Sequence, residues 1–289
     1  MTYSIIARDP ETGELGVAVQ SRAFGTGGAC AWATAGVGAV ATQSFTERRY
    51  GPRGLALLAD GRPPREALDE LLAADDLREV RQVAFVDTSG ATAAHTGDDC
   101  IAHAGHQSEG GVSVQGNMLR SPDVWPAMAE AFDTTPGSLA ERLLAALDAA
   151  EAAGGDFRGR QAAGLVVVAG EAVEQPAVDR VFDLRVDDHE EPLRELRRLY
   201  RLAAGYRRRN GIGADADPEE EHEAALAAGL REDEAVTAAV FAHARRGELD
   251  RAAALIAELV AAQPLSLQAF ERYETLGLIP TGVLELIRR

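Results

Sequence analysis

Short apolar runs bounded by turn residues alternate with amphipathic runs over the first part of the chain. Ser4–Arg8 and Leu15–Gln20 flank the turn Asp9-Pro10-Glu11-Thr12-Gly13, and this arrangement predicts a β-hairpin. The predicted strands are Ser4–Arg8, Leu15–Gln20, Gly36–Thr42, Val83–Val86, Ala91–His95, Val112–Gln115, Gly164–Val168 and Val181–Val186. The predicted helices are Arg48–Ala59, Ala67–Leu72, Pro122–Phe132 and Leu139–Ala152. Strands and helices that come in blocks indicate a layered α/β or α+β domain, not a simple alternating βαβ array.

The pattern changes near Asp187, and from Pro192 onward the spacing is helical. Ala235–Arg245 and Leu249–Ala262 predict one helical hairpin whose spacing is like a single tetratricopeptide unit. One copy does not make a repeat array, so we expect a small all-helical domain. The predicted organisation is therefore a layered domain over residues 1–187 and a helical domain over residues 188–289.

The charge balance excludes several classes of protein. The chain has 289 residues, with 29 basic and 46 acidic side chains, and a net charge of −17. A surface this negative repels phosphate backbones, so we expect no nucleic-acid partner. Every basic residue apart from histidine is arginine, which excludes Schiff-base lysines and phosphate-loop NTPases. The acidic, lysine-free composition has two interpretations, adaptation to a salt-rich cytoplasm or a GC-rich genome, and the sequence does not decide between them.

The location of the protein is predicted from what its sequence lacks. Its two cysteines, Cys30 and Cys100, cannot form a disulfide framework. The N-terminal sequence has no basic region followed by an apolar region, and Cys30–Thr42 is too short to span a bilayer. We therefore expect a cytoplasmic protein with no membrane partner and no cofactor.

Thr2 is the first candidate for chemistry because it directly follows Met1. Methionine aminopeptidase generally removes Met before a small residue, which would leave a free α-amine and a hydroxyl on Thr2. Such an amine has a pKa of about 7.7–8.0, so its neutral form can take the proton of its own hydroxyl. The simpler interpretation is that a threonine after Met is common and has no role.

A cysteine and two histidines form a second candidate group. Cys100, His103 and His106 are three residues apart and could hold zinc through thiolate and imidazole ligands. However, no fourth ligand is evident and the spacing does not match a structural zinc site, so we predict no metal. We expect His95 and His106 to be hydrogen-bonded near strand ends instead.

The segment GGDFRGRQ has two interpretations as well. Asp156, Arg158 and Arg160 could bind a substrate carboxylate through a guanidinium fork. The favoured alternative is a structural Asp–Arg pair that fixes the turn before the Gly164–Val168 strand.

Several motifs together resemble known proteins. They are ARDPETGELGVAV, GVGAVATQ followed by YGPRGL, AHTG with Cys100 and AGH, VQGNML, and GGDFRGRQ. Over about residues 2–187 they look like the family called domain of unknown function 1028, which is placed by fold in the N-terminal-nucleophile (Ntn) hydrolase superfamily. The resemblance implies a four-layer αββα sandwich and so an α+β fold. The segments DDHEEPLRELRRLYRL and IPTGVLELIRR resemble a helical extension, found in some members, that is named for peptidoglycan binding.

The resemblance also implies roles for individual residues. Thr2 would be the nucleophile, and the backbone at Gln43 and Ser44 would donate to the oxyanion. Arg22 stands where family members often carry Lys, and it would orient the site or stabilise charge there. Ala162 stands where many members have Ser. Asn117 would complete the oxyanion hole beside Gly116, which allows close backbone approach, although a simple turn asparagine is the alternative.

Two functions follow from these observations. The first is an amide-bond hydrolase acting on a small amide or peptide-like substrate, with Thr2, Arg22, Gln43, Ser44 and Asn117 as its catalytic group. Its predicted substrate-binding residues are Gly116, His106, Asp156 and Arg160. The second is a non-catalytic protein that binds a metabolite or cell-wall fragment. By analogy with Ntn-like proteins, we also expect a homodimer.

Overall fold

The structure is a computed structural model that describes residues 2–176, 180–211, 213 and 215–287. It divides into two compact units, Met1–Arg197 and Arg198–Arg289, and the division falls within helix α6 (Pro192–Asn210). No helix in the described part of the chain is both long and apolar enough to cross a bilayer.

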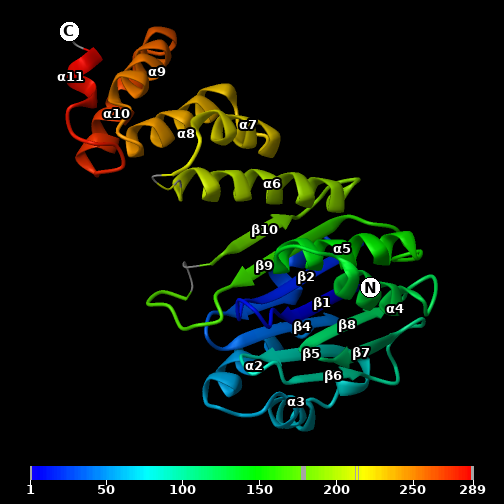
Figure 1. The fold of residues 1–289 in the computed structure, drawn as a ribbon. Helices are drawn as coiled ribbons and strands as arrows, with labels where there is room; N and C mark the ends of the chain where they lie inside the picture. The colour runs from blue at the N-terminus through cyan, green and yellow to red at the C-terminus, as the bar shows by residue number, and fades with distance from the viewer. Residues whose placement is uncertain (1, 177–179, 212, 214, 288–289) are drawn as a thin grey trace. The chain divides into compact units, whose positions relative to one another are not determined.

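The first unit contains two antiparallel sheets that pack face to face (Figure 1). The six-stranded sheet has the order β10-β9-β2-β1-β8-β7, and the four-stranded sheet has the order β3-β4-β5-β6. The strands of the larger sheet are β1 (Thr2–Arg8), β2 (Leu15–Ser21), β7 (Gly105–Glu109), β8 (Val112–Asn117), β9 (Ala162–Val168) and β10 (Phe182–Val186). Those of the smaller sheet are β3 (Ala31–Thr34), β4 (Gly38–Ser44), β5 (Arg81–Asp87) and β6 (Thr92–Thr96).

Helices cover the outer face of each sheet and complete four layers (Figure 1). Helices α4 (Val124–Thr134) and α5 (Leu139–Ala152) cover the larger sheet, and α2 (Tyr50–Ala59) and α3 (Pro64–Ala73) cover the smaller one. A Cβ placed on Gly16 of β2 would lie 2.5 Å from Leu143 Cδ1 of α5. Glycine at this position therefore lets helix and sheet approach closely. A short helix α1 (Thr26–Cys30) and a 3₁₀ turn (Arg78–Val80) lie in the connections.

Between the two sheets lies an apolar layer of small and branched side chains. It includes Ile6, Val17, Val19, Ala39, Ala41, Ala84, Val86 and Val166, all of them buried. Side chains alternate between the two faces of a strand, so these positions define which face of each strand points inward.

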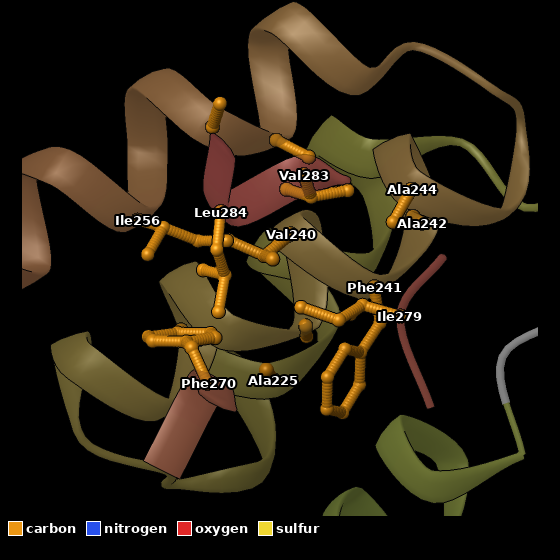
Figure 2. Close-up of a cluster of buried hydrophobic side chains, with 14 of the residues drawn as sticks. Ala225, Val240, Phe241, Ala242, Ala244, Ile256, Phe270, Ile279, Val283 and Leu284 are labelled. Carbon is orange, nitrogen blue, oxygen red and sulfur yellow. The ribbon is translucent and has the colours of Figure 1, made fainter. Parts of the chain in front are cut away.

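The second unit is all-helical. Its helices beyond α6 are α7 (Pro218–Ala228), α8 (Glu232–Arg245), α9 (Leu249–Ala262), α10 (Ser266–Thr275) and α11 (Val283–Ile287). Figure 2 shows the buried apolar cluster of this unit, in which Phe241, Ile256 and Phe270 are among the largest members. The predicted hairpin is present as α8 and α9, which pack against one another.

The predicted α+β fold with a helical C-terminal region is confirmed. The sequence missed β3 and α1, which lie in a stretch rich in glycine and alanine, and it missed β7, an edge strand with polar side chains. Pattern reading is weakest in such places, because a helix of five residues, a strand of four and a polar edge strand show too little periodicity to recognise. Strand boundaries moved outward by one or two residues at polar ends, such as β1 at Thr2 and β8 at Asn117.

Candidate functional site

At one end of the layer between the sheets, the inward positions change from apolar to polar. Every second residue of a strand faces the same way, so the strands that line the apolar layer also point their next alternate residues inward. These residues are Ser4 and Thr2 on β1, Ser21 on β2, Gln43 on β4, Gln82 on β5 and Thr96 on β6. On β8 the same period places Ser113, Gln115 and Asn117 inward. All of these except Thr96 are buried. The polar residues therefore form a continuation of the core, and not a surface patch.

Thr2 lies at the start of β1, between the ends of two neighbouring strands. It is in register with Ser21 on β2 and with Asn117 on β8. Its hydroxyl donates to Ser21 Oγ over 3.1 Å, and its exposed fraction is 4%. The main-chain carbonyl of Thr2 accepts from Gln43 Nε2 at 3.2 Å and from Asn117 Nδ2 at 3.4 Å. Three of the predicted site residues, Thr2, Gln43 and Asn117, are thus brought into contact.

Gln82 joins these groups, although no sequence motif pointed to it. Its Oε1 accepts from Gln43 Nε2 at 2.7 Å and from Asn117 Nδ2 at 2.9 Å. Its Nε2 donates to the carbonyls of Gly105 and Gly116 at 3.1 and 2.8 Å. Gln43, Gln82 and Asn117 are all buried, so the bonds among them satisfy polar atoms that water cannot reach.

Two oxygens of this cluster are left without a partner. Among the described residues, Gln43 Oε1 and Asn117 Oδ1 are buried and accept no hydrogen bond. The amide hydrogens of both residues already point at Thr2 O and Gln82 Oε1. The free groups beside Thr2 are therefore acceptors, which suit an ammonium, an N–H or a water better than an oxyanion.

A chain of hydrogen bonds runs from this cluster towards the surface. Gln82 Nε2 also contacts Thr96 Oγ1 at 2.9 Å, and Thr96 Oγ1 lies 2.8 Å from Nδ1 of His106, an exposed residue. Loss of solvent around the ring, with the charges of His95 and Arg65, lowers the pKa of His106 below its ordinary value of 6.5. The ring is therefore neutral at pH 7, and one of its nitrogens can accept a hydrogen bond. His95 Nε2 lies 2.9 Å from Arg78 O, so both histidines are hydrogen-bonded near strand ends, as predicted.

Ser44 follows Gln43 at the end of β4 and has a left-handed backbone, with φ 70°. This conformation is uncommon for serine, and it falls at the last residue of the strand. The Ser44 side chain contacts the buried Cys100, whose thiol donates to Arg81 O at 3.3 Å. Burial raises the pKa of Cys100, so the thiol stays protonated at neutral pH.

Asp156 has a structural position beside the site. Its carboxylate accepts from the main-chain N–H of Arg22 at 3.1 Å and from that of Arg158 at 2.8 Å. It therefore fixes the chain directly after Ser21. The guanidinium of Arg22 is exposed and donates to Gln161 Oε1. Arg160 contacts other groups, pairing with Glu151 at 3.3 Å and with Glu191.

Gly116 is enclosed by protein. A Cβ at this position would lie 2.5 Å from Leu119 Cδ1, so the absent side chain makes room for Leu119. Its carbonyl accepts from Gln82, as described above. Its predicted role in ligand contact remains a prediction.

The cysteine–histidine spacing does not become a metal cluster in the described part of the chain, where no group of three or more His, Cys, Asp or Glu side chains is arranged to hold an ion. Cys100 bonds to a carbonyl and His106 to Thr96. Each of these side chains thus has a neutral protein partner.

Sequence reasoning overlooked Gln82 and gave no site role to Ser21 or to Gln115, which lies within the motif VQGNML. A usable signal was present, because Gln82 and Gln115 occupy inward positions of strands that are otherwise apolar or small. A polar residue at a buried position needs a partner, so two such residues on different strands indicate a shared network.

Comparisons with known proteins identify the family. The chain belongs to a family of unknown function, DUF1028, whose model matches residues 2–196. It is similar to the crystal structure of protein SPO2555 from Silicibacter pomeroyi, also described as DUF1028, with 33% identity and a TM-score of 0.64. That match covers 70% of this chain and 89% of the other. A comparison with curated proteins finds no match.

Proposed function

We propose that the first unit is an N-terminal-nucleophile amide hydrolase in which Thr2 attacks the substrate after removal of Met1. The observation that carries the proposal is the position of Thr2, whose hydroxyl lies 3.1 Å from Ser21 Oγ and whose carbonyl is held by Gln43 and Asn117. A residue fixed at the start of a central strand by both neighbouring strands is held in one geometry, as a nucleophile requires.

The chemistry uses only groups of Thr2 and water. The neutral α-amine takes the proton of Oγ1 as Oγ1 attacks the amide carbonyl, and a tetrahedral oxyanion forms. The resulting ammonium gives that proton to the leaving nitrogen, the C–N bond breaks, and an acyl ester on Thr2 remains. Water, deprotonated by the same amine, then attacks the ester and releases the acid. Because the amine has an ordinary pKa of about 7.7–8.0, activity is expected to rise with pH through that range.

The surrounding residues take separate roles in this mechanism. The unpartnered oxygens of Gln43 and Asn117 supply acceptors for the α-ammonium, which explains why two buried amides end in free oxygens. The backbone N–H of Ser44, within the predicted Gln43–Ser44 segment, is the proposed oxyanion donor. Arg22 adds positive potential next to Ser21.

The test combines mass spectrometry with substitutions at Thr2. The purified full-length chain is expected to lack Met1 by intact mass. Against a panel of small amides, Thr2→Ala should abolish hydrolysis and Thr2→Ser should keep it. Thr134→Ala, at the exposed last residue of α4, should match the wild type. Retained Met1, or full activity in Thr2→Ala, would exclude the mechanism.

A second function, ligand binding without catalysis, is favoured by one observation. The side-chain N–H groups of Gln43 and Asn117 are already bonded within the protein and are not free for an oxyanion. In this case a metabolite or a peptidoglycan fragment would raise the melting temperature without turnover, and Thr2→Ala would bind it equally well. Peptidoglycan fragments should be tested separately on the full chain, because the likeness of its helical unit to a peptidoglycan-binding extension rests on sequence alone.

A further inference from the structure

The large exposed apolar side chains of the first unit are not scattered. Among the described residues of that unit they are Phe24, Phe45, Leu77, Ile101 and Phe157, and their exposed fractions lie between 40% and 73%. All five belong to loops that leave the sheets at the end where Thr2 lies. The turns at the opposite end, residues 9–14, 35–37, 88–91 and 110–111, contain none.

Hydrogen bonds fix this placement. Phe45 directly follows Ser44, and its N–H donates to Val80 O, while Val80 N donates to Leu77 O. Ile101 O accepts from Met118 N at 2.7 Å, and Phe157 N donates to Met118 O at 3.3 Å. Met118 is the residue after Asn117, so two of the five loops are bonded to the strand end that contacts Thr2.

A positive charge lies in the same region. Arg22 stands between Ser21 and Phe24, and it makes no ion pair with any carboxylate in the described part of the chain. Its hydrogen bond goes to the neutral amide of Gln161. In a chain of net charge −17, an exposed arginine without a carboxylate partner is available to an anion from outside.

We propose that these loops form an apolar mouth that selects the ligand of the Thr2 site, and that the ligand is an N-acyl amino acid with an aromatic or branched side chain and a free carboxylate. Exposed apolar groups on loops at the same end of the sheets mark a contact surface, and aromatic rings beside a polar interior are typical of small-molecule sites. The side chain of the ligand would pack on Phe45 and Phe157, its carboxylate would pair with Arg22, and its amide would face the polar interior. This inference rests on the proposed function for the position of the site, but it concerns binding and not turnover.

Three matched probes, each tested for binding to the full chain, separate the contribution of the apolar loops from that of Arg22. N-acetyl-L-phenylalanine carries both features, N-acetyl-L-serine lacks the ring, and N-acetyl-L-phenylalanine amide lacks the carboxylate. Isothermal titration with the Thr2→Ala variant measures binding without hydrolysis. We expect the phenylalanine probe to bind on the order of tenfold more tightly than either of the others.

Variants of surface residues identify which side chains bind the ring and the carboxylate of the probe. Phe45→Ser and Phe157→Ser should each weaken the phenylalanine probe several-fold and leave the serine probe unchanged, and Arg22→Gln should remove the preference for the carboxylate. Leu276→Ser, which removes an exposed apolar side chain of the second unit, is the matched control and should change nothing.

The outcomes distinguish the two proposals. Turnover of amides that depends on Thr2, without preference among the three probes, would overturn the apolar mouth and leave the hydrolase intact. Selective binding of the phenylalanine probe without turnover of any amide would support the apolar mouth and overturn the hydrolase. If Phe45→Ser and Phe157→Ser change the sedimentation of the protein but not probe binding, the loops are a self-association surface and the ligand proposal is wrong.

Discussion

The side-chain oxygen of Gln82 lies 2.9 Å from Asn117 Nδ2, and this bond joins the two sheets at the end where β1 begins. Gln82 belongs to the smaller sheet and Asn117 to the larger one. Most contacts between the sheets are apolar and non-directional, whereas this one specifies distance and orientation. The position of Asn117 next to Thr2 therefore depends on a residue of the opposite sheet.

Replacing Gln82 with alanine should destabilise the protein strongly. The change leaves the N–H groups of Gln43 and Asn117 short of an acceptor and the carbonyls of Gly105 and Gly116 short of a donor. Since a buried unsatisfied polar group costs about 1–3 kcal/mol, the free energy of unfolding is expected to fall by about 3 kcal/mol or more. Urea denaturation followed by circular dichroism measures this loss.

Gln107→Ala is the control for this substitution, because Gln107 lies exposed on edge strand β7. Its effect should stay within about 0.5 kcal/mol. Equal effects of the two variants would show that the amide cluster contributes nothing specific to the joining of the sheets.

Much of the architecture could be predicted from the sequence because local patterns encode it. Leu139–Ala152 was predicted with the boundaries of α5, since its apolar stripe is regular. The hairpin of β1 and β2 was predicted from its turn residues. These signals lie within a few residues of one another.

The candidate site could be predicted only in part, for a physical reason. Thr2, Gln43 and Asn117 were named from motifs, but their contact depends on the packing of one sheet on another. Gln82 was missed because its partners lie between 14 and 39 residues away in the sequence, too far for a local pattern to reveal them. The ligand-binding roles of Arg160 and Gly116 stay predictions. Arg160 pairs with Glu151 of α5 and with Glu191, and Leu119 fills the space beside Gly116.

Helix α5 is expected to depend on the reciprocal bonds at its first turn. The Ser138 side chain accepts from Glu141 N, and the Glu141 carboxylate accepts from Ser138 N at 2.8 Å. Ser138→Ala should lower the free energy of unfolding by about 1 kcal/mol, because it removes an N-cap. Ser138→Asp keeps a capping acceptor and should retain most of the stability. If Ser138→Asp has the same melting temperature as Ser138→Ala, the capping role of Ser138 is contradicted.

The close approach of β2 and α5 gives a double-mutant prediction. Gly16→Ala places a methyl group 2.5 Å from Leu143 Cδ1 and should cost about 1–3 kcal/mol through overpacking. Leu143→Ala alone should cost about 2–5 kcal/mol because it leaves a cavity. In the double variant the new methyl group occupies part of that cavity, so the loss should be smaller than the sum. Additive losses in urea denaturation would show that the two positions do not compete for the same space.

The last prediction concerns pH and the ion pair that supports the loops near Ser44. Asp75 accepts from Arg81 Nε at 2.8 Å, from Tyr50 Oη at 3.1 Å and from Leu77 N at 2.9 Å. The Arg81 hydrogen bond is the main reason that the pKa of Asp75 lies below its ordinary value of 3.8, with burial opposing it. A carboxylate whose pKa is lower in the folded state stabilises the protein above its unfolded pKa, and this contribution is lost as the pH falls through the folded value.

We therefore expect the free energy of unfolding to fall as the pH decreases from about 5 to about 3, with part of the slope due to Asp75. Asp75→Asn should cost about 1–3 kcal/mol at pH 7 and should flatten the profile, because the amide does not titrate. Asp69→Asn removes an exposed carboxylate that pairs with Arg65 over 3.2 Å, so it should leave the slope nearly unchanged. Denaturation curves at closely spaced pH values measure all three proteins, and parallel profiles for wild type and Asp75→Asn would assign the acid sensitivity to other carboxylates.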